Sequence, residues 1–181
     1  MTKSEKNLVG SFSGENYGYR ILLAFAEGAE KEGFPQIAKL FRAGAIGESI
    51  HAHNMLRAMG GGKILKKDLK VGKIQIKSLE ENLNAVVMGE YMAFTKIYPG
   101  FIEDGKVEGN KDAEQAFHLA SKVEKAHHKV FENALNSFKN GKDLPSAGIF
   151  LCPFCGYPSE EITPIKCPVC GALKEKFIEV G

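Results

Sequence analysis

Apolar residues recur every three or four positions along four long stretches of this chain, which is the period of an amphipathic α-helix. The predicted helices span residues 4–32, 35–59, 78–108 and 110–140. Ser4 is expected to cap the first helix, and Ser78 to form a capping box with Glu81 at the start of the third. Pro99 is expected to kink or end the third helix, because proline cannot donate a backbone hydrogen bond. The pattern therefore predicts a bundle of four long helices.

Polar side chains interrupt the apolar stripe of each predicted helix. They are Glu15, Glu48, His51, Glu90, Glu124 and His127. A glutamate on such a stripe is buried, and a buried carboxylate without a partner costs several kcal/mol. A histidine follows Glu48 and Glu124 by one helical turn, which indicates that the partner is a metal ion rather than a lysine.

The spacing of these residues reveals an internal repeat. A single glutamate precedes a Glu-x-x-His motif by 33 residues in the first half (Glu15 to Glu48) and by 34 in the second (Glu90 to Glu124). One Glu-x-x-His motif occurs easily by chance, whereas two helix pairs that each carry a glutamate and a Glu-x-x-His form the ligand pattern of ferritin-like di-metal bundles. We therefore expect an all-α, ferritin-like four-helix bundle with a di-metal site.

The connection between the second and third predicted helices, residues 61–77, is long and rich in lysine. About 17 extended residues can reach roughly 55 Å, which exceeds the ~38 Å length of such a bundle. The third helix can therefore start at the opposite end of the bundle, as a ferritin-like fold with one long crossover requires.

The cysteines form two Cys-x-x-Cys motifs separated by 11 residues near the end of the sequence. They are Cys152, Cys155, Cys167 and Cys170. This spacing is typical of a tetrahedral four-thiolate metal site and does not by itself distinguish zinc from iron. So short a segment buries too little surface to fold without the metal. The chain therefore divides into a bundle (1–140), a linker (141–148) and a metal-knuckle module (149–181).

Charge and hydropathy limit the binding partners and the cellular compartment that we expect for the protein. The formal net charge is +2 with both signs spread along the chain, so nothing indicates binding to nucleic acid or to a membrane surface. No apolar run approaches the ~20 residues of a membrane span, and the N-terminus has no signal-peptide pattern. We expect a cytoplasmic protein whose cysteines form no disulfides.

The motifs together resemble the rubrerythrin family, which combines a ferritin-like di-iron bundle with a small C-terminal rubredoxin-like metal-knuckle β domain. The resemblance covers nearly the whole chain. Its segments are residues 12–15, 32–37, 48–51, 88–90, 97–99 and 124–127 and the two Cys-Pro-x-Cys-Gly knuckles. It implies that the six glutamates and histidines bind two iron ions and that the four cysteines bind one more, with zinc possible in recombinant protein. It also implies that Tyr98 lies beside a ligand carboxylate.

The resemblance also implies a function. A rubrerythrin-like chain reduces hydrogen peroxide to water in defence against oxidative stress, using electrons from a reductase or a rubredoxin that pass through the four-cysteine iron. A head-to-tail homodimer is implied as well. The alternatives are a ferroxidase or dioxygen-scavenging di-iron protein, and a non-catalytic binding protein with zinc in its sites. The predicted di-metal site is our reason to favour iron over zinc at the cysteines, because a redox centre needs an electron path.

Two positions depart from the family pattern. Ala93 stands where family members usually carry a further glutamate, and Leu22 stands where they tend to carry a tyrosine. Four carboxylates balance the charge of two Fe²⁺, but a diferric pair carries two more positive charges. Without a fifth carboxylate, we expect a more open or more histidine-bound iron in the oxidised form.

The remaining histidines and the phenylalanines have structural interpretations. His53, His118 and His128 are rotated away from the predicted ligand face and are expected at the surface or in satisfied structural roles. Several phenylalanines are expected to pack in the core. They are Phe25, Phe41, Phe117, Phe131 and Phe138.

Overall fold

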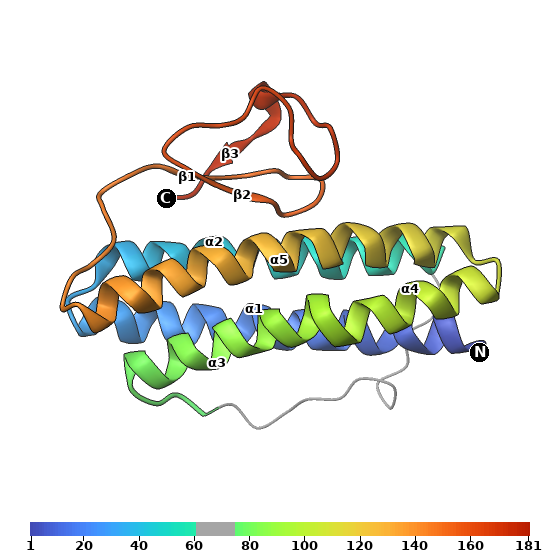
Figure 1. Ribbon diagram of the computed structural model, residues 1–181, viewed down its shortest axis with the longest axis horizontal. Helices are drawn as coiled ribbons and strands as arrows, with labels where there is room; N and C mark the ends of the chain where they lie inside the picture. The colour runs from blue at the N-terminus through green and yellow to red at the C-terminus, as the bar shows by residue number, and fades with distance from the viewer. Residues whose placement is uncertain (61–74) are drawn as a thin grey trace.

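A bundle of long helices with a small β module on one side makes up the computed structural model, which describes residues 1–60 and 75–181 (Figure 1). The bundle contains α1 (Lys3–Lys31), α2 (Pro35–Ala58), α3 (Leu79–Met92), the π-helical segment η2 (Ala93–Ile97), α4 (Tyr98–Val107) and α5 (Lys111–Lys139). The module contains β1 (Ile149–Leu151), β2 (Pro158–Glu160), the 3₁₀ segment η3 (Lys174–Lys176) and β3 (Ile178–Glu179). The predicted helical bundle with a small C-terminal β domain is confirmed.

Capping residues determine where the helices begin. The prediction that Ser4 caps α1 is wrong, because the N-cap is Thr2. The Thr2 side chain accepts a hydrogen bond from the backbone N–H of Glu5, whose carboxylate accepts one from the backbone N–H of Thr2. Ser4 has no glutamate or glutamine three positions later and cannot form this reciprocal pair. Ser78 and Glu81 do form the predicted capping box at α3.

The predicted break at Pro99 takes the form of a π-helical segment. In η2 the helix widens, so that the backbone N–H of Tyr98 bonds to the carbonyl of Ala93, five residues earlier. Pro99 follows at once, and α4 continues to Val107. Because proline lacks an N–H and its ring crowds the preceding turn, the wider geometry allows the helix to pass it. The third predicted helix is therefore interrupted rather than ended.

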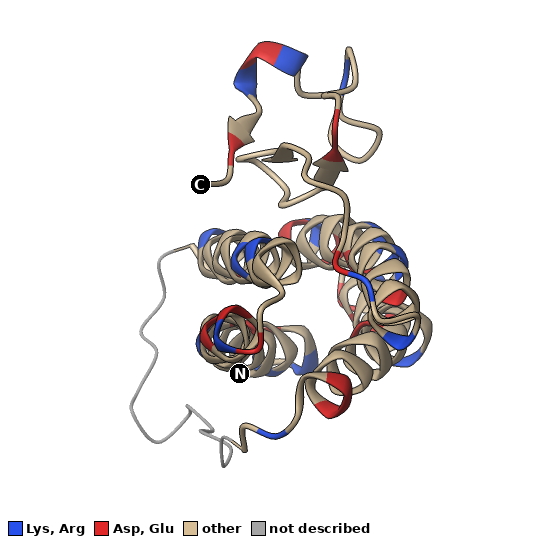
Figure 2. Ribbon diagram, turned by 90° about the vertical axis from the view of Figure 1, so that its left-hand side faces the viewer, with Lys and Arg blue, Asp and Glu red and all other residues tan. Residues whose placement is uncertain are grey.

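The helices form two packed pairs, α1 with α2, and the α3–η2–α4 column with α5 (Figure 2). Leu8 of α1 and Met55 of α2 share a hydrophobic cluster at one end, whereas Leu22 and Leu79 share another. Consequently α2 ends and α3 begins at opposite ends of the bundle, as a one-crossover fold requires. Most of the lysine-rich connection predicted between them, residues 61–74, lies outside the described residues. No helix in the described part of the chain is long and apolar enough to cross a bilayer.

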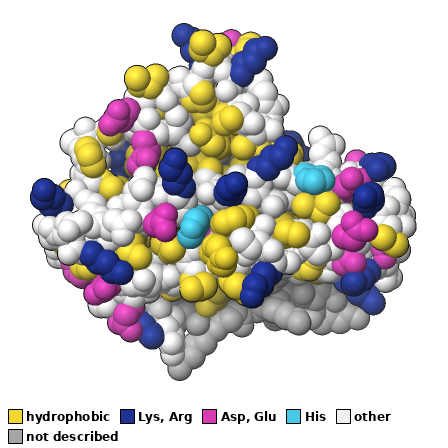
Figure 3. Space-filling view, in the orientation of Figure 1, with side chains coloured by type: hydrophobic (Ala, Val, Ile, Leu, Met, Phe, Trp, Pro, Cys, Tyr) yellow, Lys and Arg dark blue, Asp and Glu magenta, His cyan; other side chains and the backbone are white. Residues whose placement is uncertain are grey.

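Aromatic side chains fill much of the core, as predicted. Phe25, Phe41 and Phe131 are buried in one cluster and pack ring against ring. Phe117 is buried in the second cluster. Phe138 is only partly buried at the edge of the first cluster. Charged side chains of both signs are spread over the outer face of the bundle shown in Figure 3.

Two carboxylates from connecting segments bind the N-termini of other helices. Glu108, after α4, accepts hydrogen bonds from the first two N–H groups of α1 at 2.7 and 2.9 Å. Asp143, in the predicted linker, accepts hydrogen bonds from the N–H groups of Gln36 and Ile37 at 2.9 and 3.0 Å. The first N–H groups of a helix lack partners within the helix and favour negative charge. Asp143 therefore attaches the linker to α2.

The β module packs directly onto α2 and α5 (Figure 1). Its antiparallel sheet has the strand order β2-β1-β3. Ile149, Leu151 and Val180 belong to the same hydrophobic cluster as the bundle core. The side-chain amide of Asn54 on α2 donates a hydrogen bond to the carbonyl of Phe154 at 2.9 Å. The module is thus held against the two helices that carry the Glu-x-x-His motifs.

Candidate metal centre

Side chains from α1, α2, α3 and α5 meet in the middle of the bundle. Their donor atoms form two groups, each within 4.8 Å: Glu15, Glu48, His51 and Glu124, and Glu48, Glu90, Glu124 and His127. All of these side chains are buried. The structure therefore brings together all six residues selected from the sequence. Because Glu48 and Glu124 belong to both groups, they are placed to bridge two ions.

Hydrogen bonds to the β module orient both histidines. His51 Nε2 lies 3.1 Å from the carbonyl oxygen of Cys155, and His127 Nε2 lies 3.3 Å from that of Gly156. Because a carbonyl oxygen can only accept, each Nε2 carries the proton. Each Nδ1 faces the carboxylates, and with a metal ion in place of a second proton it would present a lone pair to that ion. A metal-binding imidazole needs this tautomer, with its second nitrogen held by a hydrogen bond.

The buried carboxylates destabilise one another. Burial, reinforced by the charge of Glu48, raises the pKa of Glu15 well above its usual value. Burial and the charge of Glu124 raise the pKa of Glu90 in the same way. Burial opposes a charge on His51, but the nearby Glu124 carboxylate outweighs it, so the pKa of His51 rises and that of Glu124 falls. The cluster therefore needs more positive charge than the histidines supply.

A pair of divalent cations fits this donor set. Among the described residues, the buried atoms Glu48 Oε2 and His51 Nδ1 make no hydrogen bond, although Glu124 Oε1 lies 3.1 Å from the nitrogen. Such atoms are rare, because each one costs on the order of 1–3 kcal/mol. Among the described residues, the ion-pair partners of the four carboxylates are histidines only. Two Fe²⁺ would neutralise the four carboxylates and bind the unpaired oxygen and nitrogen.

Tyr98, the first residue of α4, reaches into the same site. Its hydroxyl donates a hydrogen bond to Glu15 Oε1. Its ring is buried and packs against Phe101 and Phe117. The tyrosine therefore lies beside a carboxylate of the cluster and directs its hydroxyl proton at it.

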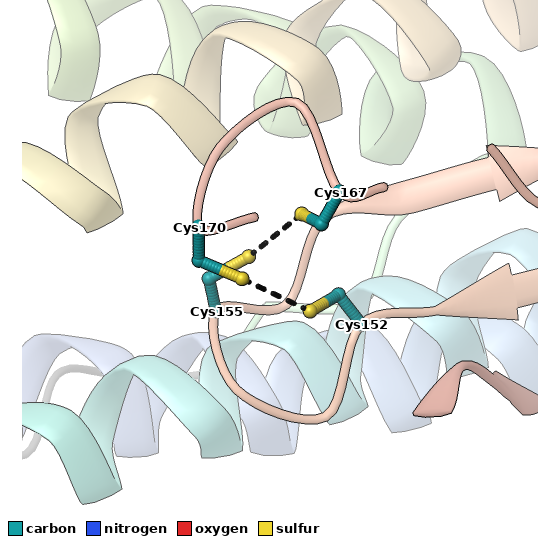
Figure 4. Close-up of side chains that lie close together, drawn as sticks. All are labelled: Cys152, Cys155, Cys167 and Cys170. Carbon is teal, nitrogen blue, oxygen red and sulfur yellow. Dashed lines mark hydrogen bonds between the residues drawn. The ribbon is translucent and has the colours of Figure 1, made fainter. Parts of the chain in front are cut away.

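The cysteines form a second cluster inside the β module (Figure 4). The Sγ atoms of Cys152 and Cys170 lie 3.4 Å apart and those of Cys155 and Cys167 lie 3.5 Å apart, and all four thiols are free. Hydrogen bonding from Cys155, helped by backbone N–H groups of the knuckle, lowers the pKa of Cys152 to about 5. The same contact raises the pKa of Cys155. Four sulfurs so arranged fit one tetrahedral ion.

The two cysteine knuckles face different surroundings. The first knuckle, residues 152–157, supplies both carbonyls that hold the histidines. In the second knuckle, residues 167–172, Cys170 is exposed, whereas the other three cysteines are buried. The sulfur cluster is therefore joined to the bundle on one side and open to solvent on the other.

Glycines permit this close approach between module and bundle. A Cβ atom on Gly47 of α2 would lie 2.7 Å from His127 Cε1, and one on Gly156 would lie 3.2 Å from His51 Nε2. Gly156 also has a φ of +87°, a left-handed conformation that favours glycine. The ligand pattern in the sequence did not single out Gly47. The available signal was a glycine directly before Glu48, because a glycine inside a helix usually costs about 0.5–1 kcal/mol.

The other histidines lie outside the site, as predicted. His53 and His118 are exposed, and His53 Nδ1 lies 3.0 Å from the carbonyl of Ser49. His128 is partly buried and its Nδ1 lies 3.0 Å from the carbonyl of Val87. None of them joins the carboxylate cluster.

A family model, related sequences and a solved structure all indicate the same family for this chain. The rubrerythrin family model matches residues 6–135. The chain is 32% identical over 176 residues to rubrerythrin-2 of Clostridium acetobutylicum, covering 94% of this chain and 92% of that protein. It is 32% identical over 176 residues to nigerythrin of Nitratidesulfovibrio vulgaris, covering 95% and 84% respectively. A structure of nigerythrin in a mixed-valence state matches with a TM-score of 0.88 at 28% identity, covering 99% of this chain and 87% of that one. The chain therefore belongs to the rubrerythrin family.

Proposed function

We propose that this chain is a rubrerythrin-type peroxidase, which reduces hydrogen peroxide to water in defence against oxidative stress. The observation that carries the proposal is the contact between the cysteine module and the two histidines. Cys155 contributes a sulfur to one cluster, and its carbonyl oxygen holds His51 of the other cluster at 3.1 Å. A peroxidase must regain two electrons after each turnover, so a built-in connection to an electron-transfer module serves it directly.

The residues that would hold the metals follow from the two clusters. Two iron ions would be held by Glu15, Glu48, His51, Glu90, Glu124 and His127. One further iron would be held by Cys152, Cys155, Cys167 and Cys170, where zinc is the alternative in recombinant protein. When bound, the iron pair supplies Lewis acidity and two electrons, and the four-cysteine iron supplies one-electron exchange.

The chain's own residues position protons for the reaction. Reduction of hydrogen peroxide to two water molecules consumes two protons. The Tyr98 hydroxyl, hydrogen-bonded to Glu15, is a proton donor already inside the buried cluster. The rings of Phe101 and Phe117 pack against Tyr98 and keep its orientation fixed. Tyr98 is therefore assigned a catalytic role, with solvent as the final source of protons.

Electrons enter, in this proposal, at the exposed side of the module. The second knuckle presents Cys170 to solvent, which suits a docking reductase or rubredoxin. The first knuckle passes them to the bundle of the same chain. The homodimer implied by the family resemblance is then not needed to bring the two clusters together.

Stopped-flow spectroscopy of the reduced, iron-loaded protein tests the proposal. The reduced protein is prepared anaerobically and is then mixed with dioxygen-free hydrogen peroxide in one experiment and with dioxygen-containing buffer in another. Peroxide is expected to reoxidise the protein much faster than dioxygen does. The reverse order would contradict the proposal and support a ferroxidase or dioxygen-scavenging role.

Metal analysis of protein from its native host distinguishes the non-catalytic alternative. The proposal requires about three iron ions per chain, since the two clusters offer that many sites. A ferric four-cysteine site should also colour the protein red. Colourless protein with zinc in every site would instead support a metal-binding protein without redox activity.

A further inference from the structure

A cavity of about 790 Å³ lies between α1 and α3 and reaches the carboxylate cluster. All four clustered carboxylates line it, whereas neither histidine does. The β module packs on α2 and α5, so the cavity approaches the cluster from the opposite side of the bundle (Figure 1). The cluster thus has one face covered by the electron-transfer module and another face open to a large cavity.

Polar side chains including Lys77, Glu81 and Asn82 line part of the cavity, and the rest of its wall is made mainly of small or apolar residues. They include Gly14, Gly18 and Leu22 of α1, Val86 and Gly89 of α3, and Ala93 of η2. A Cβ atom added to Gly14 or to Gly89 would meet no other atom of the described residues within 4 Å, so no described side chain fills the space beside either glycine. Leu22 and Ala93, the two departures from the family pattern, therefore both present alkyl groups to this cavity.

Hydrogen peroxide does not require a cavity of this size. A water molecule takes up roughly 30 Å³ of liquid, and hydrogen peroxide, with two oxygen atoms, needs roughly twice that. Apolar pockets of roughly 300–1,000 Å³ typically hold small organic ligands, with a few polar groups that orient them. Here the carboxylates lie at the inner end, where the buried Glu48 Oε2 makes no hydrogen bond with the described residues and Tyr98 also lines the cavity.

We propose that the chain reduces organic hydroperoxides of the type R–OOH, with an apolar R group seated in the cavity between α1 and α3. This inference rests on the proposed peroxidase function and specifies its substrate class. The peroxide end lies at the carboxylates, where the proposed metals bind. Leu22, Val86 and Ala93 contact the R group, and the glycines leave room for it.

The reaction balances without a further reagent. R–OOH takes up two electrons and two protons and gives R–OH and water, so the O–O bond breaks and two O–H bonds form. The electrons come from the reduced centre and are replaced one at a time by the reductase or rubredoxin that serves the module. The protons come from Tyr98 and, through it, from solvent. The apolar R–OH then leaves through the cavity.

Binding of a product alcohol tests the cavity without turnover. The probe is 2-phenyl-2-propanol, the alcohol formed from cumene hydroperoxide, titrated calorimetrically into the iron-loaded protein. One molecule is expected to bind per chain. Gly14→Leu places a side chain in the cavity and is expected to weaken binding on the order of 10-fold or more, because small changes in an apolar pocket have effects of this size.

Gly28→Leu is the matched control. Gly28 is also a helical glycine of α1 whose added Cβ would meet no atom within 4 Å, but it does not line the cavity. It is expected to bind the alcohol as the unmodified chain does. In stopped flow, cumene hydroperoxide should reoxidise the unmodified chain and Gly28→Leu alike. In Gly14→Leu, the ratio of the cumene hydroperoxide rate to the hydrogen peroxide rate should fall on the order of 10-fold.

The outcomes separate this inference from the proposed function. No alcohol binding and slow reaction with cumene hydroperoxide, beside fast reaction with hydrogen peroxide, would overturn the inference alone. Failure of both peroxides to reoxidise the protein would overturn both proposals. A dimer that Gly14→Leu dissociates, in protein that binds no alcohol, would show that a second copy of the chain fills the cavity, and the inference would again fail.

Discussion

The Nε2 atom of His51 lies 3.1 Å from the carbonyl oxygen of Cys155. A side chain of the buried carboxylate cluster is therefore bonded to the backbone of a residue whose sulfur belongs to the cysteine cluster. His127 makes the equivalent contact with Gly156 at 3.3 Å. The first knuckle thus orients both histidines, and a change in the knuckle should alter both clusters.

Gly156→Ala is expected to separate the module from the histidines. Alanine in the left-handed conformation costs about 1–2 kcal/mol. At this position its Cβ would also lie 3.2 Å from Gly47 and from His51 Nε2, so the knuckle must move away from the bundle. We expect slower electron transfer from the reduced cysteine site to the di-iron site, measured by stopped flow, together with a lower urea midpoint.

Gly171→Ala provides the control for this change. Gly171 occupies the same place in the second knuckle with a φ of +79°, but an added Cβ there meets no atom within 4 Å. It should therefore carry the backbone cost alone and leave the electron-transfer rate unchanged. Equal slowing in both variants would show that the contact with the histidines does not connect the clusters.

Gly47→Ala is expected to weaken metal binding from a position outside the ligand set. The new Cβ would lie 2.7 Å from His127 Cε1 and 2.9 Å from His127 Nε2. The ring cannot turn aside freely, because its Nε2 faces the carbonyl of Gly156 and its Nδ1 lies 3.0 Å from Glu124. Displacing a residue that orients a ligand typically lowers metal affinity 10–100-fold, so titration with Fe²⁺ should show a loss of roughly this size.

The comparison for Gly47 is Gly28→Ala. Gly28 is a helical glycine at which an added Cβ would meet no atom of the described residues within 4 Å. Alanine there should stabilise α1 by about 0.5–1 kcal/mol and leave iron binding unchanged. If Gly47→Ala bound iron as tightly as Gly28→Ala does, the His127 ring would have to be more mobile than its contacts indicate.

The six clustered residues could be predicted because they follow local rules. Residues three and four apart lie on one helix face, so Glu48 and His51 had to point the same way. A short connection between long helices makes them antiparallel neighbours, which brings Glu15 to the level of that pair. The cysteine cluster could also be predicted from a local pattern. Two Cys-x-x-Cys motifs within a short segment are typical of a four-thiolate metal site.

The position of the module on the bundle could not be predicted in this way. It depends on Gly47 meeting Gly156 and on Asn54 meeting Phe154, and these pairs are far apart in the chain with no periodic pattern to connect them. The cavity was missed for a related reason. Gly14 and Gly89 line it without side chains, and a space between two helices cannot be read from the sequence pattern of either helix alone.

Asp143→Ala is expected to destabilise the protein at the start of α2. The N-cap residue Phe34 offers no side-chain hydrogen bond, so the Asp143 carboxylate is the acceptor for Gln36 and Ile37. Loss of such a cap costs about 1 kcal/mol, to be measured by urea unfolding. Asp143→Asn keeps an acceptor oxygen and should lose less. An Ala variant as stable as the unmodified chain would show that solvent caps α2 equally well.

Glu108 should make stability depend on pH between about 2 and 4.5. Hydrogen bonds from the side chain and backbone of Ser4 lower the pKa of Glu108 from 4.5 to about 2. A carboxylate whose pKa is lower in the folded protein stabilises the folded protein fully above the unfolded pKa. That stabilisation is lost as the pH falls through the folded pKa.

Lys3 and Asp104 lie nearby, and Lys3 lowers the pKa of Asp104, so part of the acid sensitivity belongs to that pair. We therefore expect Glu108→Gln to be less stable than the unmodified chain at pH 7, with the difference in urea midpoint shrinking as the pH falls from about 4.5 and closing below about 2. A difference that stays constant over this range would show that the charge of Glu108 does not hold the start of α1.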